Sequence, residues 1–68
     1  MRFEVSEQNG FYVITDTATL TGELCVYTGA ARTPPKYKDE ANDNYQWGNY
    51  YSALGFSKRL ALANPDPS

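Results

Sequence analysis

The chain has 68 residues, eight acidic and six basic, which leaves a net charge of only −2 at pH 7. Its length allows one small domain, and so weak a charge is typical of neither a polyanion nor a nucleic-acid binder. The absence of histidine and the presence of a single cysteine exclude an internal disulfide, a Cys/His zinc cluster and histidine-dependent catalytic dyads.

These exclusions set the first expectations about function. We expect no enzyme activity, no metal and no cofactor. A lone thiol suits a reducing compartment, so we expect a cytoplasmic protein. The N-terminal residues alternate polar with apolar and lack the apolar core of a signal peptide, and no run is long enough to span a membrane.

The first element that the sequence predicts is a β-hairpin. Phe3 and Val5 alternate with polar residues, and the run 10–16 is rich in β-branched and aromatic residues. Between them stands Asn9-Gly10, a pair that tolerates the positive φ angles of a tight hairpin turn. We therefore predict strands near residues 2–7 and 10–16.

A third strand is predicted over residues 22–28, Gly-Glu-Leu-Cys-Val-Tyr-Thr, which would complete a three-stranded antiparallel sheet. Within it Cys25 lies between Leu24 and Val26, a setting typical of a small buried side chain with an unreactive thiol. The pair Pro34-Pro35 removes two backbone donors, so residues 29–38 are predicted to be a loop.

One or two short helices are predicted to follow. From about Asn44 the apolar spacing becomes i, i+3, i+4, i+7, the stripe of an amphipathic helix, carried by Trp47, Tyr50, Tyr51 and Leu54. Asn42 or Asp43 is placed to cap its start.

Gly55 stands where the first of these helices is expected to end in a left-handed residue. Ser57 is then positioned to begin a second short helix that runs through Leu62 and that Pro65 stops.

Residues 44–52 also allow a second interpretation. Tyr45, Trp47, Asn49 and Tyr51 alternate with period two, as in a strand, and Gly48 disfavours a helix. The sequence favours the helix and leaves the strand open. The predicted fold class is thus α+β, a hairpin plus third strand followed by one or two C-terminal helices, with residues 1–64 as a single domain and 65–68 as a frayed tail.

The predicted sheet has apolar residues on both faces. Phe3, Val5, Phe11, Val13, Leu24 and Val26 share one phase, and Tyr12, Ile14, Cys25 and Tyr27 share the other. A single helical layer covers only one face, so we expect the surplus of aromatic surface to meet a partner.

The function predicted from this surplus is protein–protein recognition. Aromatic contact area and acidic charge facing a basic partner surface are expected from the following residues: Glu4, Glu7, Tyr12, Asp16, Glu23, Tyr27, Tyr37, Asp39, Glu40, Asp43, Tyr45 and Trp47.

In size and type the chain is similar to phage-encoded inhibitors of nucleic-acid machinery, anti-CRISPR proteins included, and this class-level similarity rests on no motif. It implies an inhibitor that occludes the basic nucleic-acid-binding surface of a larger protein in the host cytosol.

Two alternatives stay open. Ala53-Leu54-Gly55-Phe56-Ser57-Lys58-Arg59-Leu60 resembles the turn of a helix-turn-helix DNA reader, although Tyr51 stands where that motif needs a small residue. The chain is also compatible with a small structural or self-associating phage protein, including a homodimer.

Overall fold

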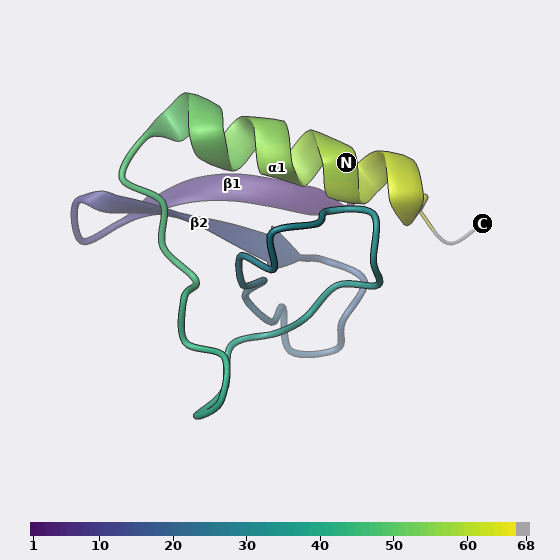
Figure 1. The fold of residues 1–68 in the computed structure, drawn as a ribbon, viewed down its shortest axis with the longest axis horizontal. Coiled ribbons are helices and arrows are strands. Elements are labelled where there is room, and N and C mark those ends of the chain that lie inside the picture. The colour runs from purple at the N-terminus through teal and green to yellow at the C-terminus, as the bar shows by residue number, and fades with distance from the viewer. Residues whose placement is uncertain (67–68) are drawn as a thin grey trace.

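The computed structural model describes residues 1–66 and combines a two-stranded antiparallel sheet with one helix (Figure 1). The strands are β1, Phe3–Gln8, and β2, Phe11–Asp16, and the helix is α1, Tyr50–Ala63. Figure 1 shows α1 lying over the hairpin, with much of the long segment 17–49 on the side away from the helix. The α+β class is therefore confirmed at its coarsest level.

The predicted hairpin is confirmed together with its turn. Asn9 and Gly10 have φ angles of 52° and 83°, the two positive values that a two-residue turn of this hand requires. Gln8 pairs directly with Phe11, and the ladder continues to Phe3 opposite Asp16.

The two-residue turn also decides which residues share a face. It pairs Val5 with Ile14 and Glu7 with Tyr12, so each odd-numbered residue of β1 shares a face with an even-numbered residue of β2. The expectation that Phe3 and Val5 lie with Phe11 and Val13 is therefore wrong. Phe3 and Ile14 are fully buried in the core beneath α1, whereas the Phe11 side chain is 46 % exposed on the other face.

The predicted third strand is wrong, because no third strand forms within residues 1–66. The edge of β2 is covered at separate points instead, through isolated bridges from Thr15 to Leu24 and from Tyr12 to Trp47. Cys25 N–H donates to the Ile14 carbonyl at 2.8 Å, and Cys25 itself bridges Tyr37. Residues 23–26 thus bond to β2 on one side and to residues 36–38 on the other, as an interior strand does, but this pairing covers too few residues to form a strand.

The prediction of two helices broken at Gly55 is also wrong. One helix runs without interruption from Tyr50 to Ala63, and Asn49 rather than Asn42 or Asp43 caps it, with its side-chain oxygen accepting from the N–H groups of Tyr51 and Ser52. Since Gly55 continues the helix, the turn on which the helix-turn-helix alternative depended does not form.

The buried stripe of α1 differs from the predicted one. It consists of Ala53, Phe56, Ser57 and Leu60, which keep the i, i+3, i+4, i+7 spacing but stand further along the chain. Tyr51 is 78 % exposed, and Trp47 precedes the helix. Small Ala53 and Ser57 let the helix approach the sheet, and the Ser57 hydroxyl is satisfied by the Leu54 carbonyl at 2.8 Å.

Neither interpretation of residues 44–52 holds for the whole stretch, because residues 50–52 begin α1 and residues 44–49 precede it. Residues 44–49 belong to neither a helix nor a named strand, and Trp47 alone forms a bridge, exchanging two main-chain hydrogen bonds of 2.8 Å with Tyr12. Beyond α1, residues 65 and 66 of the predicted tail have no regular structure, and residues 67 and 68 lie outside the described part of the chain.

One buried polar cluster joins the parts of this fold. The carboxylate of Asp16, at the end of β2, has no exposed surface, and it accepts from Arg2 through two bonds of 2.8 and 2.9 Å. The Tyr37 hydroxyl donates to it at 2.6 Å and the Ala18 N–H at 3.0 Å. A bidentate guanidinium, a phenol and an amide together offset the cost of burying the charge.

The same hydrogen bonds shift the proton equilibria of the cluster. Burial by itself would raise the pKa of Asp16, but hydrogen bonds from Arg2, Tyr37 and Ala18 favour the carboxylate and hold this pKa below its usual value. Burial and the bond to Asp16 raise the pKa of Tyr37 to about 12.

The Asp16→Asn substitution should remove most of the stability of the domain. Leaving Arg2 without its carboxylate costs about 3–5 kcal/mol, and the whole domain has only about 3–10 kcal/mol at 0.05–0.15 kcal/mol per residue. In the wild type, stabilisation by Asp16 is complete above the pKa of the unfolded chain, about 3.9, and is lost as the pH falls through the lower pKa of the folded state. Circular-dichroism melts against pH measure both effects, and an Asp16→Asn melt like that of Glu4→Gln, an exposed control, would contradict the assignment.

Tyr37 should titrate later than an ordinary tyrosine. Because its pKa in the folded state, about 12, exceeds the unfolded value of about 10, its contribution to stability is complete below the unfolded value and disappears as the pH rises through the folded one. Ultraviolet absorbance of phenolate should show a late step that is absent from Tyr37→Phe. Persistence of that step in the variant would assign it to another tyrosine.

Candidate functional site

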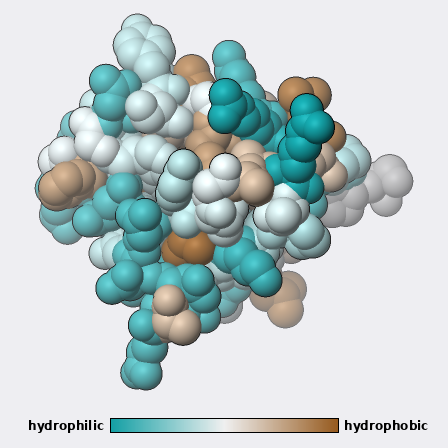
Figure 2. All heavy atoms as spheres, in the orientation of Figure 1, coloured by the Kyte–Doolittle hydropathy of each residue, from teal (hydrophilic) through white to brown (hydrophobic). Residues whose placement is uncertain are grey.

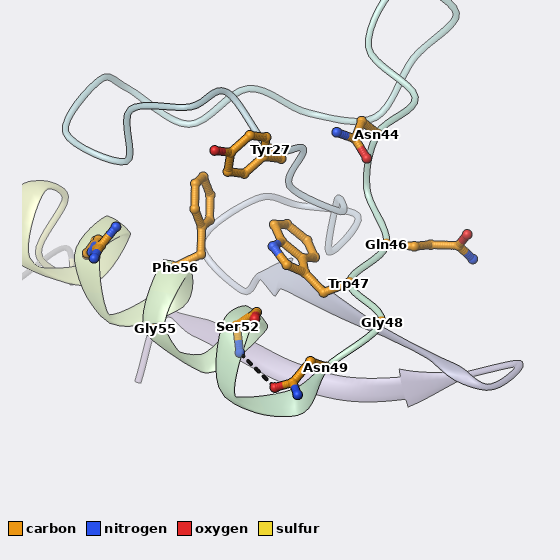
Figure 3. A pocket seen from close by; sticks show the side chains of 10 residues that line it. Tyr27, Asn44, Gln46, Trp47, Gly48, Asn49, Ser52, Gly55 and Phe56 are labelled. Atoms are coloured by element: carbon orange, nitrogen blue, oxygen red, sulfur yellow. Dashed lines mark hydrogen bonds between the residues drawn. The ribbon is translucent and has the colours of Figure 1, made fainter.

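An open groove of about 580 Å³ lies between α1 and the segment that precedes it (Figure 3). Three stretches of the chain line it. The first supplies Tyr27, the second is the segment before the helix, and the third is the first three turns of α1. The lining residues are Tyr27, Asn44, Gln46, Trp47, Gly48, Asn49, Ser52, Gly55, Phe56 and Arg59.

The floor of the groove is aromatic. The Phe56 ring lies between Trp47, at a centroid distance of 5.4 Å, and Tyr27, at 5.5 Å. Phe56 is buried and Trp47 half-buried, whereas Tyr27 is 53 % exposed. Figure 3 shows the three rings side by side, surrounded by amide side chains and by the backbone of α1. Such a floor can accept a flat or aliphatic group, and its ring faces attract a cation.

An acidic loop adjoins the groove at Asn44. We call residues 39–43 the acidic tip, since it contains Asp39, Glu40 and Asp43, all exposed. It projects at the bottom of Figure 1, and Figure 2 shows mostly hydrophilic side chains over the same projection. The Tyr27 N–H donates to the Asn44 carbonyl at 2.9 Å, which fixes the base of the tip beside the groove.

The acidic tip is held in shape by one of its own carboxylates. The N–H groups of Ala41 and Asn42 donate to Asp39 Oδ1 at 2.8 and 2.7 Å, and the Asp39 N–H donates to the Asn42 carbonyl at 2.9 Å. At the base of the tip the Lys38 ammonium lies 4.9 Å from the centre of the Tyr45 ring. Asp39 therefore serves the turn itself, and Glu40 and Asp43 carry the charge that is directed to solvent.

The structure brings together about half of the residues expected to meet a partner. Tyr27 and Trp47 share the groove, and Asp39, Glu40, Asp43 and Tyr45 stand beside it in or next to the acidic tip. Glu4 and Glu7 lie on β1, Tyr12 on β2 and Glu23 at the far end of β2, all outside the groove.

Asp16 and Tyr37 are hydrogen-bonded to each other in the interior of the protein. The carboxylate of Asp16 has no exposed surface, and the phenol of Tyr37 is bonded to it, so neither is a contact residue in this conformation. Tyr12 is also partly used internally, since its ring packs edge-on against Tyr50 at 5.6 Å.

Several groove residues were not predicted. Phe56 and Arg59 appeared only in the stretch that resembles a helix-turn-helix, where Arg59 was expected to contact DNA, and Gln46 and Ser52 carried no expectation of binding. No local pattern identifies them, because the groove forms only when residue 27, the segment 44–49 and α1 come together. Only the expected surplus of aromatic surface, to which Tyr27 and Trp47 were assigned, indicated this region.

Other candidate sites are poorer. A second hollow, of about 840 Å³, is lined mainly by small residues, with Arg32 and Arg59 as its only charged side chains. Cys25 is confirmed as a buried free thiol, and burial followed by the Asp16 charge raises its pKa to about 12. Across the described residues 1–66, no group of three or more Cys, Asp or Glu side chains is arranged to hold a metal ion.

No protein-family model, curated protein or solved structure matches this chain. Among residues 1–66 there is no helix with the length and apolar character needed to cross a membrane. Function must therefore be argued from the site itself.

Gly55→Ala should stabilise the fold while narrowing the groove. Glycine in a helix interior costs about 1 kcal/mol relative to alanine, and a methyl group at this position would meet no atom within 4 Å. The melting temperature should rise by roughly 4–8 °C, as expected for 1 kcal/mol in a domain of this size. A thermal melt measures it, and Ala61→Gly, which loses both helix propensity and a contact with the core, should shift the melting temperature in the opposite direction. A lower melting temperature for Gly55→Ala would show that the space beside Gly55 is needed by the fold.

Proposed function

We propose that this chain is a protein-binding module that docks on a basic surface of a larger protein through the acidic tip and the aromatic groove. The observation that carries the proposal is their adjacency. Asp43 is followed directly by Asn44, which lines the groove, so charge and aromatic contact area form one continuous surface. Interfaces combine the two in this way, with aromatic anchors at the centre and charges at the rim.

The acidic tip and the aromatic rings are expected to contribute differently to binding, because the charge is small and the aromatic area is large. With a net charge of −2, long-range attraction is weak, and charges at a rim mainly raise the rate of association and its dependence on salt. Retention of the partner must then come from the rings. The groove is open, and Tyr27, although its ring packs against Phe56, still presents about half of its surface to solvent.

An inhibitory role is part of the same proposal. A module that places Glu40 and Asp43 against lysines and arginines occupies positions where the phosphates of a nucleic acid bind. The partner is therefore proposed to be a nucleic-acid-processing protein, and occlusion of its basic channel is the proposed mechanism.

Charge reversal at Glu40 and Asp43 tests the proposal. These two are chosen because Asp39 closes the turn of the tip and its loss would alter the loop. Tagged wild type and Glu40→Lys/Asp43→Lys are used to capture proteins from lysate, and the affinity for each captured protein is then measured at several salt concentrations. We expect the double variant to bind about tenfold more weakly, as for a loss of about 1.4 kcal/mol, with a flatter salt dependence.

The matched control is Glu4→Lys/Glu23→Lys, which changes the net charge equally outside the tip and the groove. Equal losses in both double variants would mean that only total charge matters. Wild-type capture that the tip variant leaves unchanged would remove the electrostatic part of the proposal, and a captured protein that still binds its nucleic acid in the complex would remove the inhibitory part.

A further inference from the structure

One side of the backbone of residues 44–49 is already hydrogen-bonded to β2. Trp47 exchanges both of its main-chain hydrogen bonds with Tyr12 of β2. Beside such a bridge the flanking residues direct their N–H and C=O groups to the opposite side, which at Gln46 and Gly48 is the side away from β2. The chain bends at Gly48 and Asn49, so this edge ends at Gly48, just before α1. Within the described chain, 1–66, neither residue has a main-chain hydrogen-bond partner.

These unpaired groups belong to two residues that line the groove. Gln46 and Gly48 both line it, yet Figure 3 shows the Gln46 side chain pointing away from the three rings, and Gly48 has no side chain. Their contribution to the wall is therefore main chain. A short sheet edge with free donors and acceptors thus stands next to an aromatic floor.

This combination is the one by which proteins capture extended peptides. Main-chain hydrogen bonds to an exposed edge supply affinity, and pockets beside the edge receive alternate side chains of the added strand. The edge here is only a few residues long, so a peptide gains few hydrogen bonds and depends on the floor for the rest.

Charge selects the kind of peptide. At the Asn44 end, Asp43 and the rest of the acidic tip favour a lysine or arginine, whose cation can also lie over the faces of Tyr27 and Trp47. Arg59 lines the same groove from α1 and disfavours a second cation there. The groove is thus suited to a segment that is basic at one end and neutral or acidic at the other.

We propose that the groove binds an extended basic segment of a partner protein by strand addition, with the segment pairing to the main chain of Gln46 and Gly48 and one of its cationic side chains lying on the Tyr27–Phe56–Trp47 floor. The inference rests on the proposed function and names the part of the partner that the groove receives.

The probe for the test is a random library of short peptides selected on the wild-type protein, from which the most enriched peptide is synthesised. We expect lysine or arginine to be enriched at one end only. Since Trp47 is the only tryptophan and lies in the floor, its fluorescence should change on titration. Methylating the backbone nitrogens of the peptide one at a time should weaken binding at every second residue, about tenfold for each lost hydrogen bond.

Gly48 offers a matched pair of variants. Gly48→Pro removes the N–H donor, whereas Gly48→Ala keeps it and places a methyl group where no atom lies within 4 Å. We expect Gly48→Pro to lose about tenfold in affinity and Gly48→Ala to bind like the wild type. Should Gly48→Pro fail to fold, the methylated peptides on the wild-type protein give the same information.

Three results would overturn strand addition: selection that yields no peptide, uniform tolerance of backbone methylation, or equal binding by the two Gly48 variants. The proposed function fails separately. If Glu40→Lys/Asp43→Lys loses its captured protein while Gly48→Pro keeps it, docking through the tip stands and strand addition is wrong. If wild type captures no protein, docking itself is wrong.

Discussion

The buried carboxylate of Asp16 is the constraint on which the rest of this small structure depends. It sits at the end of β2 and binds Arg2 from before β1 and Tyr37 from the long irregular segment. Arg2 also reaches the Asn64 carbonyl just after α1, at 3.4 Å. With a single cysteine and no candidate metal cluster among residues 1–66, one ionic group performs the cross-linking that disulfides or zinc provide in many domains of this size. The fold is therefore sensitive to the loss of this charge, because Arg2 and Tyr37 both bind the same carboxylate and Arg2 is positioned by it.

The irregular segment between β2 and α1 is what makes the proposed binding surface available. A regular third strand along β2 would have used the edge of the sheet completely. Instead the chain touches that edge at isolated residues, among them Leu24 and Trp47. Between these contacts it projects the acidic tip and leaves the main chain of Gln46 and Gly48 unpaired. The segment is thus anchored well enough to hold the Tyr27, Trp47 and Phe56 rings in place and is free enough to present new hydrogen-bonding groups.

Local features could be predicted from the sequence, whereas contacts between distant residues could not. Asn9-Gly10 carries its own conformational preference, so the hairpin could be located, and the parity of a two-residue turn would also have put Phe3 on the face of Ile14. The predicted helix began too early because its apolar stripe was assigned to the large side chains of Trp47, Tyr50 and Tyr51. The observed helix instead packs through Ala53 and Ser57, whose small size permits close approach to the sheet. Gly55 was interpreted as a stop because a left-handed glycine commonly ends a helix. Here it stays helical, at a cost of about 1 kcal/mol relative to alanine that packing of Phe56 and Leu60 offsets. The site was predicted in part, since composition marks the aromatic and acidic residues, but no pattern in the chain records that residue 27 lies beside residue 56 or that Asp16 is internal.

The contact between Arg2 and Asn64 has a practical consequence for the topology of the chain. It brings the two ends of the folded unit to one point, at the right of Figure 1, while the acidic tip projects at the lower left. Ends that meet in space can be joined by a short linker and the chain reopened elsewhere, as circular permutation does in many domains. Reopening at Asn9-Gly10 would convert the hairpin into two separately supplied strands and leave the groove and its acidic neighbour on one unbroken stretch. The molecule is therefore suited to insertion within a host protein, with the acidic tip directed away from the junction.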